Sequence, residues 1–226
     1  MDILKTVVII LAGGSGKRFG SKKQFVPICG KPVLAHTVGR FKGFTKVITI
    51  AKNSMLEALT IASENDFSDC TLARGGETRQ ESVFSALKHI HKVYSPDNVV
   101  ITDANRPLIT NVNIHRGLKL LKVSNCDGVV SVCKAVNTIC TFNEDQDRYV
   151  VLPRKDMYDL LMPQFFKFNI IYEAHKNTKL VDITDDSQLL DQEKIALLDI
   201  PFWEGLKLTY PEDYKIFEIL LKKEKK

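Results

Sequence analysis

Glycines and cations follow the first apolar run of the chain, in the segment LAGGSGKRFGSKKQF. Gly13, Gly14 and Gly16 let the backbone turn tightly and bring its N–H groups close to phosphate oxygens. Arg18 and Lys23 can fold over a triphosphate from the other side. The P-loop motif GxxxxGK[ST] has no match in this segment. The dinucleotide-binding fingerprint GxGxxG also fails, because a phenylalanine occupies its last glycine position. The segment therefore predicts a phosphate-binding loop. Its spacing favours neither a P-loop kinase nor a Rossmann oxidoreductase. The plainer alternative is a glycine turn with solvated charges.

A carboxylate, Asp103, follows a second apolar run, residues 98–102. At the carboxyl end of a parallel strand it could hold Mg²⁺, which prefers hard oxygen ligands and takes others from phosphate and water. An aspartate before a turn is more often a capping residue, and only the nearby phosphate loop favours the metal. In-line attack on phosphorus needs positioning and charge neutralisation rather than a covalent nucleophile. Together the two features predict nucleotidyl transfer with release of pyrophosphate.

The elements that must position these groups alternate along the chain. Short runs rich in Val and Ile predict buried parallel strands, at residues 6–11, 46–51, 98–102 and 128–132. Helical spacing of apolar residues separates them, at Val83, Leu87 and Ile90 and again at Ile114, Leu118 and Leu121. This alternation predicts an α/β fold, a three-layer Rossmann-like sheet that is mostly parallel and binds ligands at its carboxyl edge.

The alternation weakens after residue 132. Residues 136–151 mix β-branched side chains with an acidic, turn-prone stretch at 143–147, which predicts a protruding hairpin arm. Residues 211–221 predict a closing helix with three core-facing side chains, Tyr214, Phe217 and Leu221. The chain contains no internal repeat or linker, so residues 1–226 are predicted to form a single domain.

Composition limits the classes of partner. The 226 residues are 44% hydrophobic and carry a formal charge of +5. No run of eighteen apolar residues exists and no signal peptide is predicted, which favours a cytoplasmic protein without membrane contact. Part of the positive charge lies in a tail predicted to be solvated and frayed, Lys222, Lys223, Lys225 and Lys226. A small anion is therefore a better partner than nucleic acid. The five cysteines match no zinc or disulfide spacing and are predicted to be free thiols.

Further motifs recur in a fixed order: GGETRQESV (75–83), DANRP (103–107), NTI (137–139), Arg154, MPQFF (162–166), TDD (184–186) and GLKLTYPED (205–213). In these motifs, over nearly its whole length, the chain resembles the cytidylyltransferases that activate methylerythritol phosphate or ribitol phosphate. The resemblance implies the nucleotidyltransferase form of the sheet and a dimerisation arm at about 136–154. It also implies a homodimer that binds CTP, Mg²⁺ and a small polyol phosphate.

The resemblance also implies roles for individual residues. The nucleotide site would comprise Leu11, Ala12, Gly13, Gly14, Gly16, Arg18, Lys23, Gly76, Glu77, Arg79, Ser82 and Asp103. The acceptor site would comprise Asp103, Ala104, Arg106, Thr138, Arg154 and Lys207, with Arg154 supplied across a dimer. The catalytic residues would be Arg18, Lys23, Asp103 and Lys207. Asp103 would bind the metal, with Glu204 as a weaker second ligand.

For two of the motifs, the residues alone predict a structural role. The alternating stretch 206–208 makes Lys207 a solvent-facing strand residue, so its functional role depends on the resemblance. Asp185 and Asp186 are expected to cap a helix that begins near Ser187.

Four substitutions depart from the pattern of a methylerythritol phosphate enzyme: Thr102, Asn105, Asn137 and Met162. Most fall in the acceptor half, where hydroxyl partners distinguish one polyol from another. The sequence therefore favours ribitol 5-phosphate or a related polyol phosphate as acceptor. The alternatives are 2-C-methyl-D-erythritol 4-phosphate, a guanylyl- or uridylyltransferase of similar architecture, and an inactive nucleotide-binding homologue.

Overall fold

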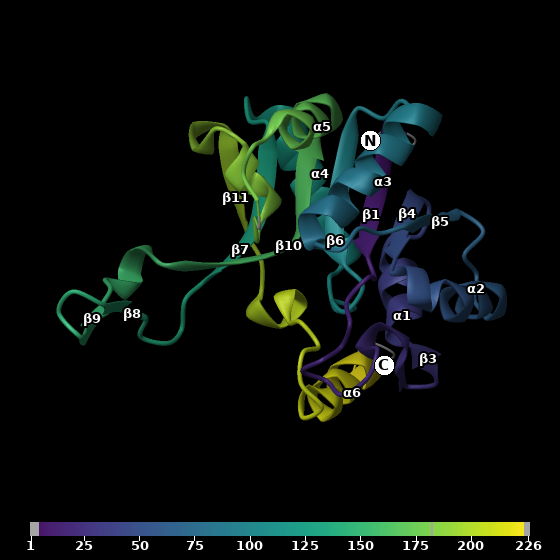
Figure 1. Ribbon diagram of the computed structural model, residues 1–226, viewed down its shortest axis with the longest axis horizontal. Helices are drawn as coiled ribbons and strands as arrows, with labels where there is room; N and C mark the ends of the chain where they lie inside the picture. Colours follow the sequence, from purple (N-terminus) through teal and green to yellow (C-terminus); the bar gives the residue numbers. More distant parts are fainter. Residues whose placement is uncertain (1–4, 182, 224–226) are drawn as a thin grey trace.

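A seven-stranded sheet forms the centre of the protein (Figure 1). The structure is a computed structural model that describes residues 5–181 and 183–223. The strand order is β11 (Ile195–Asp199), β7 (Gly128–Lys134), β10 (Tyr158–Lys167), β6 (Asn98–Asp103), β1 (Thr6–Leu11), β4 (Thr45–Ile50) and β5 (Cys70–Arg74). Only β10 runs antiparallel to its neighbours, β6 and β7. The prediction of a mostly parallel α/β sheet is confirmed.

Six α-helices are described: α1 (Val33–Arg40), α2 (Met55–Glu64), α3 (Arg79–Val93), α4 (Asn111–Val123), α5 (Phe168–Asn177) and α6 (Asp213–Lys223). Residues of α1, α2 and α4 share a hydrophobic cluster with Val8 and Ile10 of β1. Residues of α3 and α5 share another with Val7 and Ile9. Because successive residues of a strand point to opposite faces, the helices form one layer on each side of the sheet. The predicted three layers are present.

Short elements connect these layers. A two-stranded ribbon consists of β2 (Pro27–Ile28) and β3 (Lys31–Pro32). The 3₁₀ helices are η2 (Lys23–Phe25), η3 (Lys52–Ser54), η4 (Arg154–Asp156), η5 (Asp186–Leu189), η6 (Gln192–Lys194) and η7 (Phe202–Gly205). The closing helix, α6, buries Phe217 and Leu221 and packs Tyr214 in a small third cluster with Ile28, as predicted.

Strand prediction succeeded where runs are apolar on both faces. β1 has the predicted bounds, β4 lies one residue earlier than expected, and β6 and β7 extend slightly further. No specific strand was predicted at β5, β10 or β11. Two of these, β5 and β11, lie at the sheet edges and are only partly buried. The third, β10, contains Pro163 and a register shift between Leu161 and Gln164, which interrupt any simple pattern.

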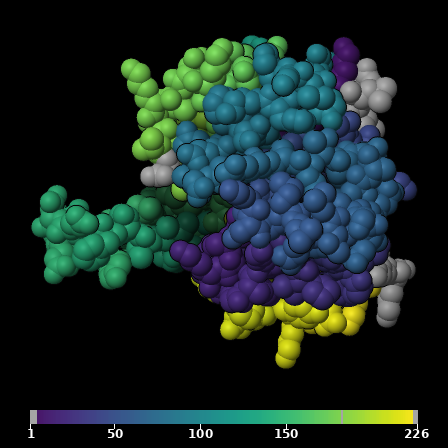
Figure 2. Space-filling view, turned by 45° about the vertical axis from the view of Figure 1, so that its right-hand side comes forward, coloured from purple at the N-terminus to yellow at the C-terminus, as the bar shows by residue number. Residues whose placement is uncertain are grey.

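The predicted hairpin arm is present. β8 (Cys140–Asn143) pairs with β9 (Arg148–Val151) in an antiparallel ribbon between β7 and β10. Figures 1 and 2 show this segment projecting from the body of the protein. Its turn includes Asp147 at a positive φ of 46°. The arm leaves large apolar side chains such as Phe142 and Tyr149 exposed.

The predictions for the termini and cysteines have mixed outcomes. Lys222 and Lys223 belong to α6, and Lys222 pairs with Glu218 at 2.8 Å, so the expectation of a frayed tail is wrong for these two. Lys225 and Lys226 lie outside the described residues. All five cysteines are free thiols. No helix within the described ranges is long and apolar enough to cross a membrane.

Close packing of α4 on β10 depends on Gly117. A Cβ added there would lie 2.3 Å from two ring carbons of the fully buried Phe165. Gly39 is also helical, but its added Cβ would have nothing within 4 Å. The two glycines therefore form a matched pair for testing the packing of this layer.

We predict opposite effects of alanine at these two positions. Gly117→Ala should lower the free energy of unfolding by about 1–3 kcal/mol, because the new methyl group overpacks the core against Phe165. Gly39→Ala should raise it by roughly 0.5 kcal/mol, since alanine reduces the entropy of the unfolded chain. Urea unfolding monitored by circular dichroism measures both. A Gly117→Ala protein as stable as wild type would contradict the close approach.

Candidate active site

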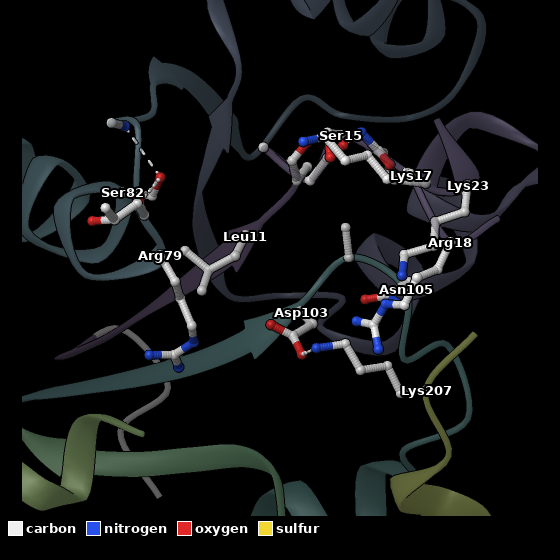
Figure 3. A pocket seen from close by; sticks show the side chains of 18 of the residues that line it. Leu11, Ser15, Lys17, Arg18, Lys23, Arg79, Ser82, Asp103, Asn105 and Lys207 are labelled. Atoms are coloured by element: carbon white, nitrogen blue, oxygen red, sulfur yellow. Dashed lines mark hydrogen bonds and ion pairs between the residues drawn. The ribbon is translucent and has the colours of Figure 1, made fainter. Parts of the chain in front are cut away.

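A cavity of about 590 Å³ opens where β1 and β6 end (Figure 3). Leu11 and Asp103, the last residues of these strands, are partners in the sheet register. The cavity unites most of the predicted site residues: Leu11, Ala12, Gly13, Gly14, Gly16, Arg18, Lys23, Gly76, Glu77, Arg79, Ser82, Asp103, Ala104 and Lys207. In Figure 3, Arg79 and Ser82 lie at one end and Lys17, Arg18 and Lys23 at the other.

The loop after β1 is shaped by glycine and by a buried amide. Gly16 has a φ of +69°, and an added Cβ would lie 1.7 Å from the carbonyl oxygen of Ser21, so only glycine fits this turn. The side chain of Gln24 is buried and donates to the carbonyl oxygens of Ala12 and Gly14 at 3.0 and 3.1 Å. Gln24 was not among the predicted site residues. Its function is to hold the loop against the cavity.

The lysines of the loop point in different directions. Lys23 lines the cavity, whereas Lys22 donates to the carbonyl oxygen of Asn53 and pairs with Glu57 at 3.3 Å. Burial, followed by the charges of Lys207 and Arg18, lowers the pKa of Lys23 below its usual value. A bound anion would offset this repulsion, which is the electrostatic signature of a phosphate site.

Asp103 is the buried carboxylate of the cavity. Its Oδ2 lies 3.0 Å from Lys207 Nζ and 3.2 Å from Arg106 Nε. Burial raises the pKa of Asp103, but the charges of Lys207, Arg106 and Arg79 outweigh it and hold that pKa well below its usual range. The carboxylate is therefore ionised at neutral pH and balances part of the surrounding positive charge.

Lys207 reaches Asp103 from a loop and not from a strand, so the predicted strand at 206–208 is wrong. The DANRP segment holds this loop on both sides of Lys207. Arg106 Nη1 donates to the carbonyl oxygen of Gly205, while Asn105 Nδ2 donates to that of Leu208 at 2.5 Å. The backbone N–H of Leu208 in turn donates to the carbonyl oxygen of Asn105. Asn105, one of the four departures from the family pattern, therefore holds the loop that carries Lys207.

The GGETRQESV motif forms the capped N-terminus of α3. Thr78 and Glu81 make a reciprocal capping box, in which each side chain accepts from the other's backbone N–H. Ser82 Oγ accepts from the backbone N–H of Gly76 at 3.1 Å and donates to the carbonyl oxygen of Thr78. This network holds residues 76–78 in a rigid turn on the cavity wall. The positive end of the helix dipole faces the same side.

The TDD motif supports the site from outside the cavity. Asp185 caps η5 by accepting from the backbone N–H of Ser187, as predicted. Asp186 has a different role, because its buried carboxylate pairs with Arg79 Nη2 at 2.6 Å. The expectation that both aspartates cap a helix is wrong for Asp186.

Glu204 does not line the cavity, which removes it as a second metal ligand. Its buried carboxylate accepts from the backbone N–H and hydroxyl of Thr110 at 2.9 Å and from Asn113 Nδ2 at 2.8 Å. These bonds fix η7 to the N-terminus of α4, where a negative charge is favourable. No group of three or more His, Cys, Asp and Glu residues that could hold a metal occurs within residues 5–181 and 183–223. Asp103 stays the candidate metal ligand.

Two predicted acceptor residues lie on the arm and outside the cavity. Thr138 is exposed before β8, and Arg154 begins η4, where its Nη1 donates to the carbonyl oxygen of Val136 at 2.8 Å. Of the four departures from the pattern, Asn105 lines the cavity while Thr102, Asn137 and Met162 do not. Thr102 and Met162 are buried and Asn137 is exposed on the arm. Within one chain, these three substitutions therefore do not change the lining of the cavity.

Comparison with known proteins agrees with the motifs. The family model for 2-C-methyl-D-erythritol 4-phosphate cytidylyltransferase matches residues 6–223. The chain is 32% identical over 222 residues to the protein of that name from Dehalococcoides mccartyi, covering 96% of this chain and 95% of that protein. It is also 32% identical over 225 residues to the one from Endomicrobium trichonymphae, covering 97% of this chain and all of that protein.

The fold has a similarly close counterpart. The crystal structure of 4-diphosphocytidyl-2C-methyl-D-erythritol synthase from Anaerococcus prevotii superposes with a TM-score of 0.81 at 23% identity. The alignment covers 96% of each chain. At this identity the likeness concerns the fold, and it confirms the nucleotidyltransferase form of the sheet.

The divergent directions of the neighbouring lysines give a direct test of the phosphate site. Lys23→Ala should weaken binding of a nucleoside triphosphate roughly 10- to 100-fold, the usual cost of losing a hydrogen bond to a charged group. Lys22→Ala removes the same charge one residue earlier but only an exposed contact, so affinity should stay within about twofold of wild type. Isothermal titration calorimetry at fixed ionic strength measures both. Equal losses from the two variants would mean that only net charge matters.

Proposed function

Because the chain belongs to the 2-C-methyl-D-erythritol 4-phosphate cytidylyltransferase family, we propose that it joins CTP to the phosphate of 2-C-methyl-D-erythritol 4-phosphate and releases pyrophosphate. Membership makes the protein a nucleotidyltransferase. The observation that carries the proposal is the one cavity in which the glycine-rich loop, Arg18, Lys23, Asp103 and Lys207 meet.

This acceptor replaces the ribitol 5-phosphate favoured by the sequence. The family match and the names of the relatives support methylerythritol phosphate. The argument for a pentitol rested on substitutions in the acceptor half, and Thr102, Asn137 and Met162 do not line the cavity. The remaining substitution, Asn105, has an explanation in the placement of Lys207.

In the proposed reaction a phosphate oxygen of the acceptor attacks the α-phosphorus of CTP. A new P–O bond forms, the bond from the α-phosphorus to the bridging β-oxygen breaks, and pyrophosphate leaves with that electron pair. The reaction needs both anionic substrates close together and in line. Arg18 and Lys23 on the loop suit the triphosphate, and Lys207 beside Asp103 suits the acceptor phosphate. These cations neutralise charge that accumulates in the transition state.

Magnesium fits the chemistry of Asp103. The carboxylate is ionised, lines the cavity and is a hard oxygen donor. With Asp103 as its protein ligand, Mg²⁺ would take its other ligands from the substrates' phosphates and from water. Bound there, it would supply further neutralisation of the phosphate charge.

The arm supports a homodimer in which each acceptor site is completed by the second copy. Arg154 and Thr138 carry acceptor roles in the family resemblance but lie outside this chain's cavity. The arm also exposes apolar side chains, Val136, Phe142, Tyr149 and Val151, that a partner surface could bury. A second copy of the chain would serve both needs.

We predict turnover with a defined substrate pair. With CTP and Mg²⁺, 2-C-methyl-D-erythritol 4-phosphate should give a kcat/KM at least about 100-fold above that for ribitol 5-phosphate, because buried polar partners reject the wrong polyol strongly. UTP and GTP should be poor donors. Coupled pyrophosphate release measures all combinations. A preference for ribitol 5-phosphate would restore the first reading of the sequence, and CTP binding without turnover on any acceptor would favour an inactive homologue.

We also predict that two defective variants rescue one another. Asp103→Asn and Arg154→Ala should each lower turnover about 100-fold when alone, since each removes a charge from the reacting centre. After unfolding and refolding together, half of the dimers should be mixed, with one site carrying both native residues. About a quarter of wild-type activity should therefore return if the arm acts in trans. Mixing the two folded proteins without exchange is the control. Absence of rescue in confirmed mixed dimers would place Arg154 outside the partner's site.

A further inference from the structure

A buried ion pair and a histidine connect the cavity to α5. Asp186 Oδ2 accepts from Arg79 Nη2 at 2.6 Å, and its Oδ1 accepts from His175 Nε2 at 3.1 Å. The side chains of Asp186 and His175 are fully buried, whereas Arg79 lines the cavity and is 24% exposed. The three residues come from α3, η5 and α5. Of the three, only Arg79 can reach a ligand.

The ring of His175 is held in a fixed place behind Asp186. Its Nδ1 has no hydrogen-bond partner among the described residues, and the ring of Phe84 stacks on it with the ring centroids 6.2 Å apart. Its other nitrogen, Nε2, lies against Asp186 Oδ1. Asp186 is therefore held by two side chains, Arg79 on Oδ2 and His175 on Oδ1.

Both charges of the pair are held in their ionised forms. Burial raises the pKa of Asp186, but the hydrogen bond from His175 and the charge of Arg79 outweigh it and hold that pKa below its usual range. The backbone around Asp186 is also fixed. Asp185 Oδ2 accepts from Gln164 Nε2 at 2.5 Å, and Gln80 Nε2 donates to the carbonyl oxygen of Leu180 at 2.9 Å. The segment that carries Asp186 is thus bound to both β10 and α3.

One donor of Arg79 has no partner in the protein. Nη1 is buried and makes no hydrogen bond within the described residues. Because Nη1 is shielded, a ligand can meet only the part of Arg79 that is exposed at the cavity wall, where the positive charge would attract an anionic group. Arg79 shares the cavity wall with Gly76 and Ser82, at the end opposite to Lys23 and Arg18 (Figure 3).

We propose that Asp186 and His175 are positioning residues that hold the Arg79 side chain at the cavity wall, where its charge binds CTP. The identity of the nucleotide rests on the proposed function. Asp186 fixes one edge of the guanidinium, and His175 fixes the carboxylate from behind. Because an arginine side chain has many rotamers, holding it before binding reduces the entropy lost on binding. Neither positioning residue touches the ligand.

The test separates positioning from bracing of the fold. His175→Phe keeps an aromatic ring against Phe84 but removes the donor to Asp186, and His175→Gln keeps a donor. His175→Phe should raise both the Kd and the KM for CTP about tenfold, one lost contact to a charged group, with kcat within about twofold. His175→Gln should recover most of the affinity. Calorimetry with CTP and Mg²⁺, together with steady-state kinetics, measures these values.

Ser131→Ala is the matched control. The Ser131 hydroxyl is also fully buried, and it donates to the carbonyl oxygen of Pro163 at 2.6 Å, but it does not line the cavity. This variant should lower the melting temperature to an extent similar to His175→Phe and leave the Kd for CTP unchanged. If His175→Phe also loses stability without losing affinity, the three residues only brace the fold and the proposal is overturned.

A double-mutant cycle tests whether His175 acts through Arg79. Arg79→Lys should weaken CTP binding, and adding His175→Phe should weaken it no further, because the group being positioned is already absent. Independent, additive losses would contradict the proposal. Should His175→Phe not fold, Asp186→Asn replaces it in the same cycle. A wild type that fails to bind CTP contradicts the proposed function as a whole, whereas normal CTP binding by His175→Phe contradicts this inference alone.

Discussion

The cavity holds several cations close to one buried carboxylate, and the arrangement of the site follows from this excess of positive charge. Lys23 has its pKa lowered by burial and by its cationic neighbours, while Asp103 is held ionised by Lys207, Arg106 and Arg79. The protein alone does not neutralise these charges. Polyanionic substrates do, so binding relieves a repulsion that folding has created. The folded state tolerates the repulsion because other contacts fix the backbone that carries each charge.

Those contacts share one physical form. A buried polar side chain outside the reacting centre binds the backbone or the charge of a cavity segment. Gln24 holds the glycine-rich loop, Asn105 holds the loop of Lys207, and Glu204 fixes η7 to α4. Asp186 does the same for the guanidinium of Arg79. Because a buried polar group without a partner is costly, each of these side chains favours one placement of its segment over all others. The cavity segments are thus held in place by buried polar side chains.

The arm, residues 136–154, is not held by contacts of this kind. It leaves large apolar side chains exposed and carries Arg154 and Thr138 away from the cavity in the same chain. Its ribbon has only two strands, which are marginal without other packing. A second copy that covered this surface would stabilise the arm and bring further positive charge to the acceptor side. Under the proposed function, one chain supplies the cavity for the nucleotide and a second copy completes the acceptor side.

The sequence by itself determined the features that have a local physical cause. Runs that are apolar on both faces of a strand predicted β1, β4, β6 and β7. Apolar residues at helical spacing predicted α3 and α4, and the glycines predicted the turn at Gly16. The order of the motifs predicted that Arg18, Lys23 and Asp103 share one site, and all three line the cavity. Local pattern failed at β10 and at residues 206–208, where an irregular strand and a loop take their form from distant partners.

Only the tertiary structure decided which polar residues act together. The family resemblance implied Glu204 as a second metal ligand, yet its carboxylate accepts from Thr110 and Asn113, 94 and 91 positions earlier. Arg79 meets Asp186 across 107 positions. Such pairs are invisible to periodicity because a hydrogen bond depends on distance in space, and the fold alone sets that distance. The residue types therefore determine which chemistry is available, and the packing of the layers determines which groups act together.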